Sequence, residues 1–412
     1  MQPILFVTIF SSFVLLALLV KTLWSVVSDS MQNRTAQKRL LSIEQSTRLQ
    51  LDHTLKRTYT VHSLNRRQTR WRNALVVRVV KETEDSLSFY LIDDEHEPLP
   101  ASLPGQHILV RRPVRDDSAG NCRCYSLSDD CSAGHWRITV KKNSNRPESV
   151  SRWLHEEISV GDMLQVRGPC GAFFLDTGPE RNIVLVSAGI GITPIIPMLT
   201  EAIRKNYRSI HCFSQFRDVA HMPFADSLLN LAKKNPQFRI NIWISRFPKG
   251  VRESAKGLFF EGKFQATDLT KHQGSIEFSD YYLCGPEEWQ ARIRSELIAV
   301  GVSSESVRYE LFHQSEGPSP AIGSTPFRQH SIYFKQSRAN ARFQANQSSL
   351  LACAGQNNIS MESGCRTGAC GSCAVRLMRG TVRYTREPQF LTQESEILPC
   401  VCVPESDLEI DA

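Results

Sequence analysis

Three cysteines near the C-terminal end of the sequence lie within the glycine-rich stretch MESGCRTGACGSC. Cys365, Cys370 and Cys373 have the spacing C-x4-C-x2-C, and Cys400 and Cys402 follow further along the chain. This spacing with a distant fourth cysteine is typical of a [2Fe–2S] cluster bound by four thiolates. Small residues suit a loop that wraps closely around an inorganic core and directs its N–H groups at sulfur. The loop therefore predicts an iron–sulfur site.

Zinc and disulfide bonds are the alternative uses of these cysteines. A structural zinc site prefers paired short Cys spacings or Cys/His knuckles, whereas this segment has one C-x2-C and no nearby histidine. Disulfides need an oxidising compartment and suit a small secreted domain better than a chain of 412 residues with 12 cysteines. The cluster fits both the spacing and the composition of the loop.

The N-terminal end combines an apolar segment with a basic one. Residues 2–20 carry no charge and are nearly all apolar, which matches the ~20 residues that cross ~30 Å of hydrocarbon. A cleaved signal peptide or a buried core helix is the alternative, but no basic n-region or small-residue cleavage site is present. Nine Lys/Arg and three Asp/Glu follow between Asp29 and Arg70. We expect a transmembrane anchor over residues 1–27 and a basic juxtamembrane segment over 28–70, with the remaining domains facing the cytoplasm.

The charge distribution argues against a nucleic-acid partner. The surplus of six in the juxtamembrane segment, together with Lys21, accounts for the whole net charge of +7. Residues 71–412 are therefore formally neutral, and a basic surface for phosphate backbones is not expected there.

Short β-rich runs separated by turns occupy residues 74–175. They read ALVVRVV, SFYLI, HILVRR, WRITVKK and DMLQVRG, and this spacing without long helices predicts a small antiparallel barrel. Within it, RCYSL offers a cation at Arg123, a ring at Tyr125 and a hydroxyl at Ser126; the first two share a face because side chains alternate on a strand. Further on, SVSRWLHEEISVGD predicts a helix that begins near Ser151, and a helix N-terminus can bind phosphate.

A different pattern begins at residue 182. NIVLVS, AGIGITP and IIPMLTEAIRKN read as strand, glycine-rich turn and helix, a context in which backbone amides meet phosphate. SIHCFSQF, FRINIWISRF and DYYLCGPEEW add buried strands, so a parallel sheet with ligands at its strand C-termini is predicted. Gly189 and Gly191 match only part of G-x-G-x-x-G. A Pro/Gly/Ser-rich stretch over 313–326 predicts a linker before the cysteine-rich tail.

The order of these motifs resembles a known family. RCYSL, AGIGITP, YLCGP and the C-x4-C-x2-C loop follow one another as in the ferredoxin–NADP reductase-like flavoprotein reductases that carry a C-terminal plant-type ferredoxin domain. That family supplies electrons to bacterial oxygenases, hydroxylases and desaturases. The resemblance covers about residues 72–412. It implies a multidomain fold: an antiparallel β-barrel flavin domain over 71–176, an α/β parallel-sheet NAD(P) domain over 177–312, and a β-grasp-like [2Fe–2S] ferredoxin domain over 327–412.

The resemblance also implies roles for residues of the flavin site. Tyr125 would stack on the isoalloxazine, Ser126 would reach toward the flavin N5, and Arg123 would hold phosphate. Ser151 and its helix would bind the pyrophosphate. Glu310 and Phe312, in YELF, resemble the segment that closes the flavin pocket.

Further implied roles concern the dinucleotide and the cluster. The glycine-rich turn would face the nicotinamide dinucleotide through Gly189, Gly191, Ile192 and Thr193. Beside the nicotinamide would lie Cys284, a predicted catalytic residue together with Ser126, and its neighbour Gly285. The predicted cluster ligands are Cys365, Cys370, Cys373 and Cys400, where Cys400 is preferred to Cys402 because L-x-C precedes it as in ferredoxins.

Cofactor choice depends on three local sequences. GPCGAFFL looks more like the FAD-binding members than the FMN-binding ones, so FAD is predicted. Ser245 and Arg246, in ISRF, resemble a pair that reads a 2′-phosphate, which favours NADPH over NADH; a strand-end arginine in solvent is the alternative. Glu148 departs from the family, which has glycine three residues before the matching serine. The local phosphate geometry is therefore uncertain on the sequence alone.

Together these features predict a membrane-anchored NAD(P)H-dependent flavin and iron–sulfur reductase. Two electrons would leave the nicotinamide as hydride, and the flavin would pass them singly to the cluster. No 2-His-1-carboxylate or haem motif is evident, so the electrons must go to a partner, for which a membrane desaturase, hydroxylase or oxygenase is the first choice. The alternatives are a non-catalytic NAD(P)H-linked redox sensor and a reductase of a quinone or cytochrome.

Overall fold

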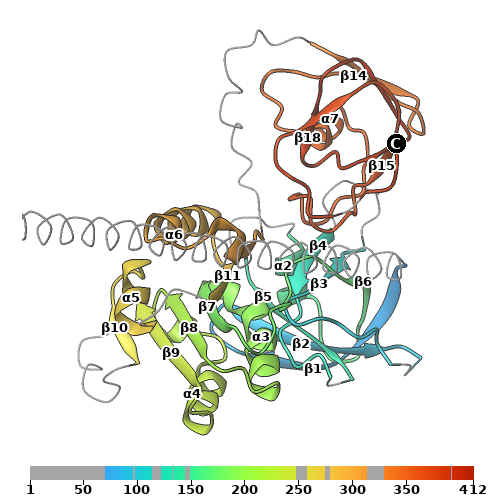
Figure 1. The fold of residues 1–412 in the computed structure, drawn as a ribbon. Coiled ribbons are helices and arrows are strands. Elements are labelled where there is room, and N and C mark those ends of the chain that lie inside the picture. The colour runs from blue at the N-terminus through green and yellow to red at the C-terminus, as the bar shows by residue number, and fades with distance from the viewer. Residues whose placement is uncertain are drawn as a thin grey trace, which may run out of the picture. The chain divides into compact units, whose positions relative to one another are not determined.

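The structure is a computed structural model, and its described part comprises most of the chain after residue 69 (Figure 1). The predicted anchor, nearly all of the juxtamembrane segment, and the predicted linker lie outside the described residues, as does Glu148. The described ranges are 70–95, 98–113, 122–132, 134–143, 149–246, 258–273, 279–312, 329–390 and 392–412.

The described helices are too short to span a bilayer. None of them is both long and apolar enough to cross a membrane. The two longest, α3 (Ile192–Arg204) and α6 (Glu287–Ala299), have 13 residues each, or about 20 Å at ~1.5 Å per residue against ~30 Å of hydrocarbon. The predicted fold class and membrane localisation are corrected to what the described residues show, which is three domains and no membrane-spanning helix.

The first domain is a six-stranded antiparallel sheet in the order β4-β3-β6-β1-β2-β5, and a bridge between Leu127 and Ile138 joins the edge strands. All five predicted runs form strands, which confirms the barrel. Apolar side chains that alternate along the strands fill its interior, for example Val76, Phe89 and Ile108, each fully buried. The elements are β1 (Arg72–Lys81), β2 (Ser86–Asp93), β3 (His107–Arg111), β4 (Cys122–Ser126), β5 (Trp136–Lys141), α2 (Val150–Glu156) and β6 (Met163–Cys170).

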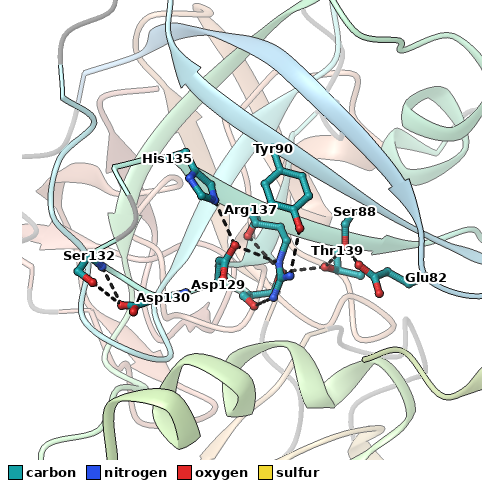
Figure 2. Close-up of polar contacts among 10 residues, drawn as sticks. Glu82, Ser88, Tyr90, Asp129, Asp130, Ser132, His135, Arg137 and Thr139 are labelled. Carbon is teal, nitrogen blue, oxygen red and sulfur yellow. Dashed lines mark hydrogen bonds and ion pairs between the residues drawn. The ribbon is translucent and has the colours of Figure 1, made fainter. Parts of the chain in front are cut away.

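A polar network anchors the loop that follows β4 (Figure 2). Arg137 of β5 donates from Nε to Ser128 Oγ at 3.2 Å and from Nη1 to Tyr90 Oη at 3.3 Å. His135 Nε2 lies 3.1 Å from Asp129 Oδ2 in the same loop. Because the loop is tied to β5 and β2, the end of the strand that carries Tyr125 and Ser126 is held in place.

The second domain is a parallel sheet in the order β10-β9-β8-β7-β11-β12. From β7 the chain places β8, β9 and β10 in turn on one side, and then β11 and β12 on the other side. The strand order therefore reverses between β7 and β11. Ligands of such sheets bind at the carboxyl ends of the strands beside this reversal. Besides α3 and α6, the elements are β7 (Asn182–Ala188), η1 (Gly189–Gly191), β8 (Ile210–Phe216), η2 (Val219–His221), α4 (Ala225–Lys234), β9 (Phe238–Ile244), β10 (Phe259–Glu261), α5 (Thr267–Gln273), β11 (Ser279–Cys284), η4 (Ser304–Ser306) and β12 (Val307–Glu310).

Buried ion pairs connect the end of the barrel to this sheet. Arg308 of β12 lies 3.1 Å from Asp176 Oδ1 and 3.4 Å from Asp280 Oδ1, and Arg181 Nε donates to Asp280 Oδ2 at 2.7 Å. Burial alone would raise the pKa of Asp280, but the hydrogen bond from Arg181 and the charge of Arg308 lower it below its usual value. The network fixes β12, and therefore Glu310 at its end, against the barrel.

The third domain is a mixed five-stranded sheet in the order β14-β13-β19-β15-β17, with a separate pair β16-β18. The parallel pair β13 and β19 and the single helix α7 are consistent with the predicted β-grasp-like fold. The cysteine loop lies between α7 and β15. The elements are β13 (Ser331–Phe334), β14 (Ala339–Arg342), α7 (Leu350–Gln356), β15 (Val375–Arg379), β16 (Val382–Tyr384), β17 (Glu396–Ile397), β18 (Cys402–Pro404) and β19 (Leu408–Ile410).

Candidate flavin, nucleotide and iron–sulfur site

Backbone N–H groups of the cysteine loop converge on one sulfur. Cys365 Sγ accepts from the N–H of Thr367, Ala369 and Cys370, each at 3.3 Å. Hydrogen bonds with the thiols of Cys124 and Cys370, and those from Thr367, hold the pKa of Cys365 well below its usual range. The loop thus favours a thiolate, which is the form of cysteine that binds metals.

At two glycines of this loop, the neighbouring atoms leave no space for a side chain. A Cβ on Gly371, whose φ is +70°, would come within 2.4 Å of the Phe390 ring, and a Cβ on Gly364 would lie 3.1 Å from Cys370 Sγ. The cysteines predicted as ligands are between 3% and 8% exposed. A tightly wrapped, buried thiolate loop fits a [2Fe–2S] cluster.

The four predicted ligands stand in two pairs. Cys365 interacts with Cys370, and Cys400 with Cys373, through their side chains. Among the described residues, no three His, Cys, Asp or Glu side chains surround a single point as one metal ion requires. A [2Fe–2S] cluster has two irons, each bound by two thiolates, so its four ligands are expected in two pairs. The side chain of Cys400 interacts with that of Cys373, whereas Cys402 lies on β18 opposite Tyr384, so the geometry supports Cys400.

On the flavin side, Ser126 and Glu310 lie close together with a histidine that the sequence did not single out. His107 Nδ1 is 3.0 Å from Glu310 Oε1, and Ser126 Oγ is 3.5 Å from Glu310 Oε2. All three residues are at most 5% exposed. Burial would lower the pKa of His107, but Cys170 and Glu310 raise it well above its usual value. One histidine in an apolar strand carried no sequence signal.

The other predicted flavin contacts are engaged within the protein. Arg123 Nη1 donates to the carbonyl of Cys122 at 2.8 Å, and Tyr125 packs against the barrel core. The N-cap of α2 is Ser149. Ser151 is the second helical residue, and its Oγ accepts from the N–H of Asn143 at 3.2 Å.

The glycine-rich turn meets the YLCGP segment at the reversal of the sheet. A Cβ on Gly191 would come within 2.2 Å of the Cys284 carbonyl oxygen, whereas one on Gly189 would meet nothing within 4 Å. Thr193 Oγ1 donates to the Ile190 carbonyl at 2.9 Å, and Ile192 is buried at the start of α3. The two turns are therefore in direct contact.

Cys284 is fully buried beside Glu310, its partner in the register of β11 and β12. Burial and the nearby Glu310 carboxylate raise the pKa of Cys284 well above its usual range, so the thiol stays protonated. Gln290, a second residue not anticipated from sequence, donates from Nε2 to the carbonyls of Gly285 and Glu310 at 2.7 and 2.6 Å. This amide ties the two segments together.

One small pocket is lined by predicted flavin residues and by the cysteine loop. Ser151, the glycine-rich turn, and the exposed pair Ser245 and Arg246 at the end of β9 are not part of its lining. The lining residues are His107, Cys124, Ser126, Glu310, Leu311, Phe312, Cys365, Thr367 and Ala369.

Three family models match the chain, and they follow one another in the order of the three domains of the structure. An oxidoreductase FAD-binding domain matches residues 96–175, an oxidoreductase NAD-binding domain matches residues 185–295, and a 2Fe-2S iron-sulfur cluster binding domain matches residues 332–405. The predicted class, an NAD(P)H-dependent flavin and iron–sulfur reductase, is thereby confirmed. So are its predicted cofactors, FAD, a [2Fe–2S] cluster and NAD(P)H.

Among curated proteins, the chain is similar to flavohemoproteins. It is 32% identical to that of Chromobacterium violaceum over 253 residues, which are 60% of this chain and 62% of that protein. It is 33% identical to that of Rhodopirellula baltica over 255 residues, or 60% and 61%. The chain thus spans less than two thirds of these relatives.

Solved structures share the fold. The flavohem-like FAD/NAD binding domain of nitric oxide dioxygenase from Vibrio cholerae O1 biovar El Tor has a TM-score of 0.52 at 28% identity, and the match covers 58% of this chain and 98% of that one. Phthalate dioxygenase reductase has a TM-score of 0.52 at 23% identity, over 83% of this chain and 98% of that one. An intact type IV self-sufficient cytochrome P450 monooxygenase has a TM-score of 0.60 at 22% identity, over 83% and 41%.

Proposed function

We propose that this protein is an electron-transfer reductase that oxidises NAD(P)H at FAD and delivers single electrons through a [2Fe–2S] cluster to a separate acceptor protein. The observation that carries the proposal is the shared pocket, because Ser126 and Glu310 from the flavin side line it together with Cys365 of the cluster loop. The chemistry that bound FAD and a bound cluster supply is the conversion of a two-electron donor into single electrons.

The chain would contribute orientation and proton handling. The Tyr125 ring offers a face for a flat heterocycle. The Ser126 hydroxyl and the Glu310 carboxylate are a buried donor and acceptor 3.5 Å apart, suited to hold a proton beside a flavin. Cys284, as a neutral thiol, would position the nicotinamide rather than act as a nucleophile.

The glycine-rich turn would receive the dinucleotide. It lies at the sheet reversal, where α/β sheets bind their ligands, and the Cβ-free surface of Gly189 leaves room for close approach. Ser245 and Arg246 follow β9 at the same carboxyl edge and are exposed. An exposed guanidinium at this edge supports NADPH as the donor, since it can bind a 2′-phosphate with two parallel hydrogen bonds.

The acceptor is proposed to be an oxygenase, hydroxylase or desaturase. The predicted cluster is a one-electron centre, which suits an acceptor protein that takes up electrons singly. A quinone or a cytochrome is the alternative acceptor. Because the curated relatives are named flavohemoproteins, a haem protein is one acceptor to test.

Anaerobic titration of the full chain with NADPH, and separately with NADH, tests the proposal. We expect one nucleotide to bleach the flavin absorbance and to produce the rhombic EPR signal of a reduced [2Fe–2S] cluster. Flavin reduction without any cluster signal, in protein with full iron content, would contradict the electron route. Slow turnover with every artificial acceptor would favour the redox-sensor alternative.

A further inference from the structure

Two arginines and a tryptophan form a cationic surface on the barrel. The Arg111 guanidinium lies 4.0 Å and the Arg167 guanidinium 5.0 Å from the centroid of the Trp71 ring. Both cations also approach the same acceptor, since Arg111 Nη2 and Arg167 Nη1 are each 3.2 Å from Oε1 of Glu362. Two positive charges of the flavin domain therefore share a single carboxylate just before the cluster loop.

Arg167 also reaches the cluster loop itself. Its Nη2 donates to Ser372 Oγ at 2.5 Å. Ser372 is 8% exposed, and its hydroxyl lies 3.2 Å from Cys370 Sγ. A cation of the flavin domain is thus connected through one hydroxyl to a predicted cluster ligand.

The apolar side of the same surface is close-packed. Residues of β3, β4 and β6 and of the cluster loop form one buried group, in which Leu109 of β3 lies against Gly364 of the loop. A Cβ on Gly364 would lie 2.6 Å from Leu109 Cδ2, so the glycine allows the contact. The members of the group are Leu109, Cys122, Cys170, Cys365, Ala369 and Cys370.

We propose that Trp71, Arg111 and Arg167 are a docking site for Glu362, and that occupancy of this site sets the rate at which single electrons pass from flavin to cluster. The effect on rate rests on the proposed function, whereas the docking does not. Without Glu362, two guanidiniums would repel each other beside one indole. With it, the cluster loop is held where Cys365 and Ser126 line one pocket. One electron leaves the flavin and one enters the cluster, so no further reactant is needed.

The exposure of these ion pairs makes the docking sensitive to salt. The side chains of Arg111 and Glu362 are 35% and 40% exposed, whereas that of Arg167 is 14% exposed. Partly exposed pairs are screened as the Debye length falls from ~10 Å at 0.1 M to ~3 Å at 1 M ionic strength. The flavin-to-cluster rate is therefore expected to fall with added salt.

The test uses the full chain loaded with both cofactors and compares Glu362→Gln with Glu405→Gln. Glu405 is a matched control because it is 49% exposed and pairs with Arg383 at 3.4 Å, within the ferredoxin domain. Stopped-flow mixing with NAD(P)H gives the ratio of the cluster and flavin reduction rates. We expect Glu362→Gln to lower this ratio roughly fivefold at low salt and to abolish its salt dependence, and Glu405→Gln to match the wild type.

A second substitution examines the arginines. In the Glu362→Gln background, Arg111→Gln removes one of two charges left facing each other, so part of the lost rate should return. A further fall in rate, equal to that caused by Arg111→Gln alone, would mean that the two residues act independently and would overturn the shared docking site.

Amide hydrogen exchange of the oxidised protein without nucleotide separates docking from the electron route. Glu362→Gln should speed exchange in the cluster loop, β3 and β6, and Glu405→Gln should not. If the wild-type cluster is never reduced by NAD(P)H, the proposed function fails, and this exchange result still decides the docking. Equal exchange in Glu362→Gln and Glu405→Gln would refute the docking site.

Discussion

Cys365 of the cluster loop takes its backbone hydrogen bonds from the loop itself, whereas Glu310 on the flavin side of the same pocket takes its side-chain contacts from distant strands. Cys365 Sγ accepts from N–H groups two to five residues away. Glu310, in contrast, meets His107 from 203 positions earlier in the chain and Ser126 from 184 positions earlier. The backbone donors to Cys365 can therefore form locally, while the flavin side exists only when the barrel and the parallel sheet are correctly joined.

This difference predicts different sensitivities in the two regions. Changes in the loop should remove the cluster and leave the flavin and nucleotide domains folded. Changes at the junction should weaken the flavin side and spare the cluster. The following substitutions test the separation, in order of decreasing effect.

The largest effect is expected for the fourth cluster ligand. Cys400→Ser should abolish the visible absorbance and EPR signal of the cluster, because Cys373 would lose its partner. Cys402→Ser should retain both signals, since Cys402 lies on β18 opposite Tyr384, while it is Cys400 whose side chain interacts with Cys373. Iron analysis with EPR of the reduced protein measures the outcome. Retention of the cluster in Cys400→Ser and its loss in Cys402→Ser would reverse the assignment.

The next effect concerns the junction behind Glu310. Arg308→Leu removes the cation that pairs with the carboxylates of Asp176 and Asp280. Breaking a buried ion pair in this way costs about 3 kcal/mol. We expect this loss in the free energy of unfolding of the flavin and nucleotide domains, measured by urea denaturation, with cluster absorbance unchanged in native protein. Arg308→Lys keeps the charge and should lose less. Equal losses for Leu and Lys would show that charge is not the cause.

Two glycines of one turn give a smaller and more specific test. Gly191→Ala forces a Cβ against the Cys284 carbonyl oxygen, and overpacking of this kind costs about 2 kcal/mol. Gly189→Ala meets no atom within 4 Å, so only its φ of +55° is penalised, by about 1 kcal/mol. The thermal unfolding temperature should fall more in Gly191→Ala. A larger change in Gly189→Ala would contradict the contact between the turns.

The smallest effect near neutral pH is a pH dependence at β8, an interior strand of the nucleotide sheet. Burial and the charge of Arg239 lower the pKa of His211, near the start of β8, to about 4. Because the unfolded chain takes up this proton near pH 6.5 and the folded chain only near pH 4, stability should fall as pH drops through that window and be constant above it. Urea denaturation across this range measures the change, and His211→Gln should flatten it. An unchanged slope in His211→Gln would assign the titration to another group.

Much of the fold followed from local pattern. The five predicted barrel strands, the strand–turn–helix at the glycine-rich turn and the cysteine loop all occur where they were expected, because period-two alternation and turn residues act over a few positions. The predicted transmembrane helix was not found among the described residues. His107 and the pair of arginines around Trp71 were not anticipated, since their acidic partners Glu310 and Glu362 lie on other domains and leave no mark on local spacing. Gln290 was not anticipated because its acceptors are backbone carbonyls, which every residue has.

The sequence by itself determined the cluster loop, because three of its predicted ligands and the N–H groups that serve them lie within one short span. It also determined which side chains share a strand face, since alternation is a property of the backbone. Only the tertiary structure decided that Cys400 rather than Cys402 meets Cys373, that Gly191 rather than Gly189 touches Cys284, and that Glu362 lies between two arginines. These choices depend on how separately folded strands are brought together, which neighbouring residues in the chain do not specify.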